Sequence, residues 1–258
     1  MIETFRCPQI LPKKHQYTVF LAGPMHGAPS WQAKAPKVAA KMGIENVTFL
    51  NPHKAPGVRH VSPPPKQVNW ETFGLRMCDV ILFWIPPQAK KVKPHRIYAI
   101  TTRMELAENM VRGHKIILGV DPECRDLAGI NYLIDHKARY YGLDRKKIHS
   151  TLEDCMKELK EWIDRSSAEE PKVHHMQGPA FGPFEDLGHV MKPGMVRNED
   201  LMEHWNQTVA PGDTVYVEGD FGSEEWKPFL NGTIIQKEAE GINPSASTRQ
   251  AHYTCRSP

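Results

Sequence analysis

The chain has 258 residues, of which 40% are hydrophobic and 24% charged, and its net charge is +3. This composition is ordinary for a soluble globular protein, and the lack of a concentrated basic stripe argues against nucleic-acid binding. No run reaches the roughly 18 apolar residues that span a membrane, and the charged N-terminus lacks the apolar core of a signal peptide. The five cysteines are scattered without a CxxC pair, so we expect reduced thiols and a cytoplasmic location.

The first two thirds of the chain alternate short apolar runs with longer helical patterns. Strands are expected at 17–22, 47–50, 79–85 and 115–120, because these runs are brief, apolar and bounded by turn residues. Helices are expected at 30–42, 67–77, 100–112 and 150–165, with Ser30 as the N-cap of the first. Such alternation predicts an α/β fold with a flavodoxin/Rossmann-like parallel sheet flanked by helices.

The last third of the chain differs from the rest in its amino-acid composition. Residues 166–179 are polar and rich in helix breakers, which predicts a linker after a first domain over residues 1–165. Residues 180–258 predict a smaller α+β segment and tail, with one helix near 198–207 and strands at 214–218 and 232–236.

Glu105 is the strongest candidate for chemistry. We expect it in the first turn of the helix over 100–112, above the carboxyl edge of a parallel sheet, where open α/β folds bind their ligands. The spacing Thr102-x-x-Glu105 also fits a helix capping box, in which the glutamate bonds the N-cap amide. Spacing alone therefore leaves both a catalytic and a capping role open.

Three blocks carry a resemblance to a known family. They are Val19-Phe20-Leu21-Ala22-Gly23-Pro24, Cys78-Asp79-Val80-Ile81-Leu82-Phe83-Trp84 and Thr101-Thr102-Arg103-Met104-Glu105-Leu106-Ala107-Glu108. In this order and spacing they resemble the nucleoside 2-deoxyribosyltransferase family and its phage-type branch, over about residues 16–135. A capping role for Glu105 would not require the first two blocks, so the resemblance favours catalysis.

The resemblance implies cleavage or transfer at the N-glycosidic bond of a 2-deoxynucleoside or its monophosphate, without a cofactor or metal. Glu105 would be the nucleophile of a double displacement that passes through a glycosyl-enzyme ester. Two alternatives stay open: an N-glycoside hydrolase without base transfer, and a non-catalytic nucleotide-binding assembly protein. The expected partners are a small nucleoside or nucleotide and further copies of the chain.

Further site residues follow from the same resemblance. It implies that Asp79 holds the base and manages its leaving-group proton, while a strand-start aspartate bonded to nearby amides is the structural alternative. The residues expected to bind substrate are Phe20, Gly23, Pro24, Met25, His26, Trp31, Asn51, His53, Trp70, Trp84 and Thr102. The tryptophans could stack on the base, or they could be ordinary core residues.

The chain departs from the family pattern at two places. Phe20 stands where the family often has tyrosine, and Ala99 stands where a second acidic residue usually precedes the nucleophile. A basic loop lies between the third strand and the helix of Glu105, with Lys90, Lys91, Lys93, His95 and Arg96. Such a run predicts a solvated surface or, alternatively, a clamp for a nucleotide 5′-phosphate.

Residues 184–243 resemble, more faintly, a truncated and degenerate calcineurin-like metallophosphoesterase. Asp220 is the surviving candidate for a bridging ligand, and with Asp186 and His189 it could hold at most one ion, whereas a two-metal site needs several ligands. This segment is too small to bury its own apolar faces, so we expect it to dock on the first domain or on another subunit. The pair His174-His175 is expected to be solvated.

A homo-oligomer is expected because family members commonly complete their pockets with a neighbour's chain. The helix that begins near residue 150 also presents an apolar face made of Leu152, Met156, Leu159 and Trp162. That face could pack on a second copy or on the protein's own sheet.

Overall fold

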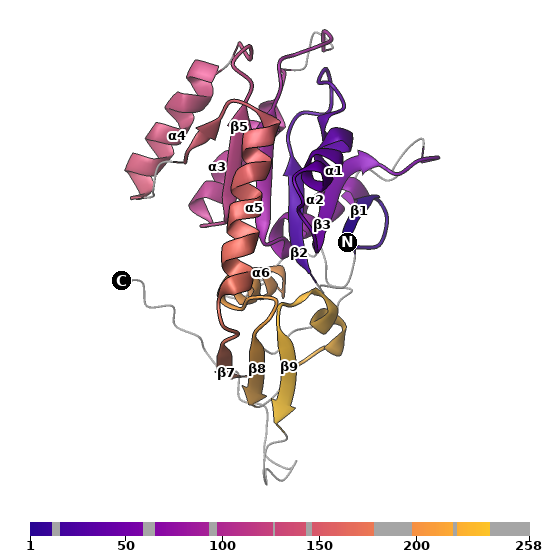
Figure 1. Cartoon of the computed structure of the whole chain (residues 1–258), viewed down its shortest axis with the longest axis vertical. Coiled ribbons are helices and arrows are strands. Elements are labelled where there is room, and N and C mark those ends of the chain that lie inside the picture. The colour runs from indigo at the N-terminus through magenta and orange to yellow at the C-terminus, as the bar shows by residue number, and fades with distance from the viewer. Residues whose placement is uncertain are drawn as a thin grey trace.

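Figure 1 shows the computed structural model, in which a larger α/β unit is joined to a smaller unit below it. The structure describes residues 1–11, 16–58, 65–92, 97–125, 127–142, 146–177, 198–218 and 221–237. The larger unit is built on a six-stranded parallel sheet, and the smaller unit on a three-stranded one.

The large sheet has the strand order β1-β3-β2-β4-β5-β6, and every neighbouring pair is parallel. Its strands are β1 (Ile2–Cys7), β2 (Tyr17–Ala22), β3 (Val47–Lys54), β4 (Val80–Ile85), β5 (Ile116–Val120) and β6 (Ile148–His149). The helices of this unit are α1 (Trp31–Lys41), α2 (Pro65–Met77), α3 (Ile100–Val111), α4 (Leu127–Tyr141) and α5 (Leu152–Ala168).

This order confirms the predicted fold class. From β2 onward the strands follow the flavodoxin-like order, in which the chain runs outward from the central strand to one side and then to the other. The direction reverses beside β2, and a crevice forms there at the carboxyl ends of the strands. The edge strand β1 and helix α4 were not expected, and β3 continues through Asn51-Pro52-His53, where a loop was expected.

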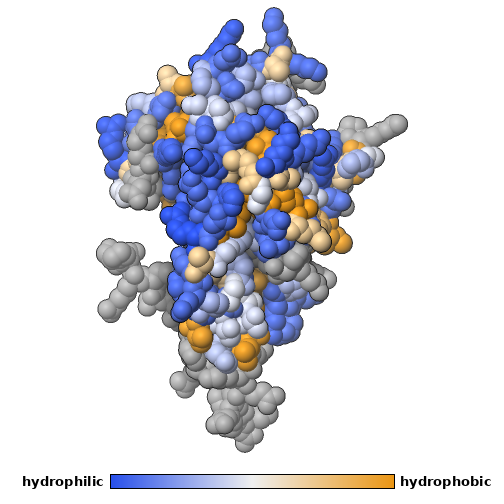
Figure 2. Space-filling view, viewed as in Figure 1, coloured by the Kyte–Doolittle hydropathy of each residue, from blue (hydrophilic) through white to orange (hydrophobic). Residues whose placement is uncertain are grey.

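Both faces of the large sheet are covered, which explains why its strands are continuously apolar rather than alternating. Val19 and Leu21 pack on one face with α1 and α5, whereas Phe20 and Ala22 pack on the other with α2, α3 and α4. The apolar face of α5, with Leu152, Cys155, Met156, Leu159 and Ile163, is buried on this sheet. The outward face of α5 is hydrophilic (Figure 2), so this helix does not offer an apolar face to a second copy.

The smaller unit contains β7 (Val173–Gln177), α6 (Asn198–Thr208), β8 (Thr214–Glu218), the 3-10 helix η2 (Glu224–Phe229) and β9 (Thr233–Lys237). Its strands are parallel in the order β7-β8-β9. Helix α6 and strands β8 and β9 occur where the sequence predicted them. The segment 166–179, expected as a linker, contains the end of α5 and all of β7.

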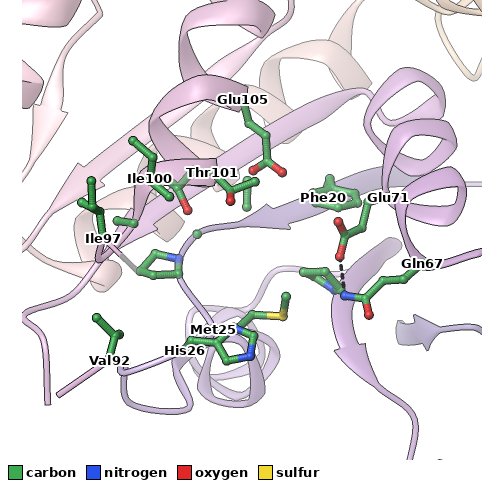
Figure 3. A pocket seen from close by; sticks show the side chains of 16 residues that line it. Phe20, Met25, His26, Gln67, Glu71, Val92, Ile97, Ile100, Thr101 and Glu105 are labelled. Carbon is green, nitrogen blue, oxygen red and sulfur yellow. Dashed lines mark hydrogen bonds between the residues drawn. The ribbon is translucent and has the colours of Figure 1, made fainter. Parts of the chain in front are cut away.

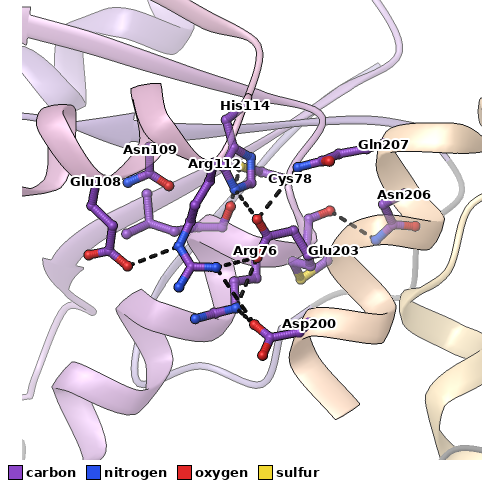
Figure 4. Close-up of polar contacts among 12 residues, drawn as sticks. Arg76, Cys78, Glu108, Asn109, Arg112, His114, Asp200, Glu203, Asn206 and Gln207 are labelled. Carbon is purple, nitrogen blue, oxygen red and sulfur yellow. Dashed lines mark hydrogen bonds and ion pairs between the residues drawn. The ribbon is translucent and has the colours of Figure 1, made fainter. Parts of the chain in front are cut away.

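A partly buried polar cluster fixes α6 to the larger unit (Figure 4). Arg76 at the end of α2 pairs with Asp200 and, at 2.9 Å, with Glu203. Arg112 and His114 also contact Glu203, at 3.3 and 3.0 Å. Burial acts to raise the pKa of Glu203, but His114 and the two arginines hold it below its usual range. The smaller unit therefore docks on the larger unit through a charge-compensated contact, in which Arg76 and Glu203 are buried.

Candidate active site

A cavity of about 610 Å³ opens at the carboxyl edge of the large sheet (Figure 3). Its walls come from the end of β2 and the loop that follows, from α2, and from the start of α3. The residues that line it are Phe20, Ala22, Gly23, Pro24, Met25, His26, Pro52, Gln67, Glu71, Val92, Ile97, Ala99, Ile100, Thr101, Thr102 and Glu105. Because the sheet reverses its strand order here, the cavity lies where an open α/β fold binds its ligand.

Glu105 projects from α3 into this cavity (Figure 3). None of the described side chains donates a hydrogen bond to its carboxylate. Loss of hydration raises the pKa of Glu105 to about 8, and the nearby charges of Glu71 and Glu108 act in the same direction. The chain thus holds an underhydrated carboxylate against a cavity, which is typical of a group that reacts or binds rather than one that stabilises the fold.

The capping-box alternative for Glu105 is wrong. Helix α3 begins at Ile100, and its N-cap is Ala99, which has a φ of 54° and no side-chain cap. Glu105 therefore lies in the second turn, not the first, and cannot bond the amide of the N-cap residue. Thr102 is buried inside the helix and lines the cavity instead.

A second carboxylate in the cavity was missed from the sequence. Glu71 projects from α2 toward the same space as Glu105, and the Nε2 of Gln67 donates to its Oε1 at 2.8 Å. Loss of hydration raises the pKa of Glu71, while the bond from Gln67 acts against this. The family resemblance predicted a second acidic residue at position 99, where this chain has alanine. The second acidic residue of the cavity is instead Glu71 on α2, 34 positions before Glu105. The four-residue spacing of Gln67 and Glu71, one turn apart on a helix, was the available signal.

Asp79 does not lie in the cavity. It precedes β4, at the amino edge of the sheet, whereas the cavity is at the carboxyl edge. Its carboxylate accepts hydrogen bonds from the backbone N–H of Thr18 at 2.8 Å and from the Nδ2 of Asn231 at 3.0 Å. The predicted role in handling the base is therefore corrected: Asp79 joins the start of β2 to the smaller unit, which is the structural alternative left open above.

The other predicted site residues separate into two groups. Phe20, Gly23, Pro24, Met25, His26 and Thr102 line the cavity, and His53 lines a neighbouring one. Asn51, Trp31, Trp70 and Trp84 are buried and do not line either cavity. The interpretation of the tryptophans as core residues fits the structure.

All three tryptophans pack behind residues that line the cavity. Trp70 packs against Phe20 and donates its indole N–H to the carbonyl of Gln9 at 2.8 Å. A Cβ at Gly23 would lie 2.3 Å from the carbonyl oxygen of Trp84 and 2.6 Å from the Trp31 ring. Glycine is required here because no side chain fits between the loop and the core.

The structure describes only part of the basic loop, up to Val92. Val92 lines the cavity, whereas Lys90 and Lys91 are exposed and do not line it. Lys93, His95 and Arg96 lie outside the described residues. The loop packs on the turn after β2, because the backbone N–H groups of residues 89 and 90 both donate to the carbonyl of Gly27.

The described residues contain no group of three or more His, Cys, Asp or Glu side chains arranged to hold a metal. Asp186, His189 and Asp220 lie outside these ranges. His174 is not solvated as expected: its Nε2 lies 2.7 Å from the buried carboxylate of Asp213. In the part of the chain that the structure describes, no helix is both long and apolar enough to cross a membrane.

Comparison with known proteins finds a family match over part of the chain. Residues 16–124 match the family described as "Nucleoside 2-deoxyribosyltransferase like", which agrees with the three sequence blocks. None of the curated proteins matches the chain. The matched segment runs from β2 to the end of β5 and includes Glu71 and Glu105, so it contains the carboxylate pair of the cavity. Strand β1 and the smaller unit lie outside it.

Proposed function

We propose that the protein is an enzyme that breaks the N-glycosidic bond of a 2-deoxynucleoside or its monophosphate in the cavity of Glu105. One observation carries the proposal: two desolvated carboxylates face one cavity at the switch point of a nucleoside 2-deoxyribosyltransferase-like segment. The cavity, at about 610 Å³, is within the roughly 300–1,000 Å³ typical of small-molecule sites.

The two carboxylates take different roles in this mechanism. Glu105 attacks the anomeric carbon as the bond from that carbon to the base nitrogen breaks, and a glycosyl ester forms. Glu71 gives its proton to the departing base. Water or a second base then attacks the same carbon, loses its proton to Glu71, and frees Glu105.

The mechanism requires the two carboxyl groups to share one proton. The reactive form carries one proton, held by Glu71, and one negative charge, held by Glu105. Because burial raises both pKa values, that of Glu105 to about 8, the pair keeps a proton at neutral pH, where two exposed glutamates would both be ionised. In the empty cavity Glu105 holds this proton, and the reactive form arises when substrate binding moves it to Glu71. The positive charge that develops on the sugar favours the anionic form of Glu105 during the reaction.

The decisive experiment is a screen of the purified protein against the common 2-deoxynucleosides and their monophosphates, read by released base. Adding a second free base distinguishes transfer from hydrolysis, since only a transferase makes the second nucleoside. Glu105→Gln and Glu71→Gln should each abolish turnover, whereas Glu161→Gln, an exposed change on α5, should not. Tight binding of a nucleotide without turnover would support the non-catalytic alternative and refute the proposal.

We further propose that the enzyme works as a homo-oligomer. Ile97, Ile100 and Met104 are 65%, 42% and 67% exposed at the start of α3, and the first two also line the cavity. A second copy that covered them would exclude water from the reacting bond. A fully active monomer in sedimentation experiments at micromolar concentration would exclude this arrangement.

A further inference from the structure

A second cavity, of about 490 Å³, adjoins the catalytic one. The two share Met25, His26, Pro52 and Gln67 as lining residues, so they form one continuous depression along the carboxyl edge of the sheet. The catalytic end lies between α2 and α3, and the second end lies over the last residues of β3. A single elongated ligand can occupy both.

The second cavity is lined by one lysine and by several hydrogen-bond-donating side chains. His26, His53 and Lys54 line it, and none of its described lining residues is acidic. The charge of Arg6 also acts on His53: loss of hydration lowers the pKa of His53, and the charges of Arg6 and His26 lower it further. The lining of this end thus carries positive charge at Lys54 and no carboxylate, in contrast to the carboxylate pair at the catalytic end.

The fold explains how these groups come together. Strand β3 continues beyond Leu50, and the Oδ1 of Asn51 accepts the backbone N–H of His53 at 2.9 Å, which holds the chain at the edge of the cavity. Strand β1 pairs with β3, placing Arg6 beside Asn51 and Cys7 beside Lys54. Because β1 lies outside the family match, the contribution of Arg6 is a feature of this chain and not of the matched segment.

We propose that the second cavity binds the phosphate monoester of the substrate, so that the enzyme acts on 2-deoxynucleoside monophosphates in preference to nucleosides. Lys54, His53 and His26 hold the phosphate oxygens, with Arg6 adding positive charge. This inference rests on the function proposed above. The phosphate of a 5′-nucleotide is attached to the sugar that reacts, so one molecule places its anomeric carbon by Glu105 and its phosphate in the adjoining cavity.

Charge separation supports this orientation. A phosphate dianion bound close to Glu105 and Glu71 would be repelled by them, and in a partly desolvated site such repulsion is stronger than in water. Binding at the other end of the depression avoids the repulsion and gains attraction from the cations. The exposed Lys90 and Lys91 do not line either cavity, so they serve as a control for general electrostatic attraction.

Binding is tested first with inorganic phosphate alone, by calorimetry and by the NMR signals of the histidine rings. We expect phosphate to shift the signals of His26 and His53, and Lys54→Gln to weaken its binding about tenfold, while Lys91→Gln changes it less than about twofold. His53→Asn provides a second variant in case Lys54→Gln does not fold. If millimolar phosphate leaves both histidine signals unchanged, or if all these variants bind it equally, the proposed subsite is refuted.

Kinetics then identify the source of the phosphate. For the wild type, kcat/KM should be higher for a monophosphate than for its nucleoside, and Lys54→Gln should lower only the monophosphate value, by about tenfold. Inorganic phosphate should compete with the monophosphate. If it binds without competing, the cavity takes free phosphate and the inference is wrong. If nothing is turned over, the proposed function fails, and phosphate binding still decides whether the subsite exists.

Discussion

Replacing Glu105 by glutamine should stabilise the fold while abolishing catalysis, and the stabilisation should depend on pH. The pKa of Glu105 is raised from 4.5 to about 8, chiefly by loss of hydration. The folded protein therefore binds this proton more tightly than the unfolded chain does. The associated stability is fully present below pH 4.5 and is lost as the pH rises through 8.

The magnitude follows from the two pKa values. At about 1.4 kcal/mol for each pH unit between them, ionising Glu105 costs the folded protein about 5 kcal/mol at pH 9. This is a large share of the roughly 5–15 kcal/mol that stabilises a typical domain. Glutamine keeps the shape of the side chain and has no charge to desolvate. The variant should therefore match the wild type near pH 4.5 and exceed it increasingly up to pH 8–9.

Urea denaturation of both proteins at several values between pH 4.5 and pH 9 measures this difference. Glu161→Gln, on the exposed side of α5, is the matched control and should show no comparable dependence on pH. A stability difference that is constant with pH, or that favours the wild type at pH 9, would mean that Glu105 is hydrated or ion-paired. Loss of hydration in the cavity would then not raise the pKa of Glu105.

Three further outcomes follow from the contacts. Asp79→Asn should leave kcat within about threefold of the wild type, because this residue lies at the opposite edge of the sheet; a loss of about 1,000-fold would restore its predicted role. Gly23→Ala should lower kcat/KM and stability together, by about 1–3 kcal/mol in unfolding experiments, since its Cβ meets Trp84. Arg76→Ala should destabilise the docking of α6 by about 3–5 kcal/mol, because it removes one of the positive charges paired with the carboxylate of Glu203. Amide hydrogen exchange should then become faster in α6, and an unchanged rate there would contradict this prediction.

The sequence by itself determined most of the secondary structure and the fold class. Buried parallel strands are runs such as Val80–Ile85, whose residues are apolar without alternation, and this pattern is visible without a partner. The sequence also located Glu105, because three blocks with fixed order and spacing carry more information than one motif. The elements that were missed or shortened have weak local signals: β1 contains charged residues, and β3 continues through a proline.

Only the tertiary structure decided which residues share the cavity. Asp79 and Glu105 flank the same strand and loop in the sequence, but a strand carries its two ends to opposite edges of the sheet. Glu71 looked like an ordinary polar residue of a helix, and packing of α2 beside β2 turned it toward Glu105. The raised pKa of Glu105 was equally invisible, since burial and neighbouring charge are properties of assembled surfaces and not of local sequence.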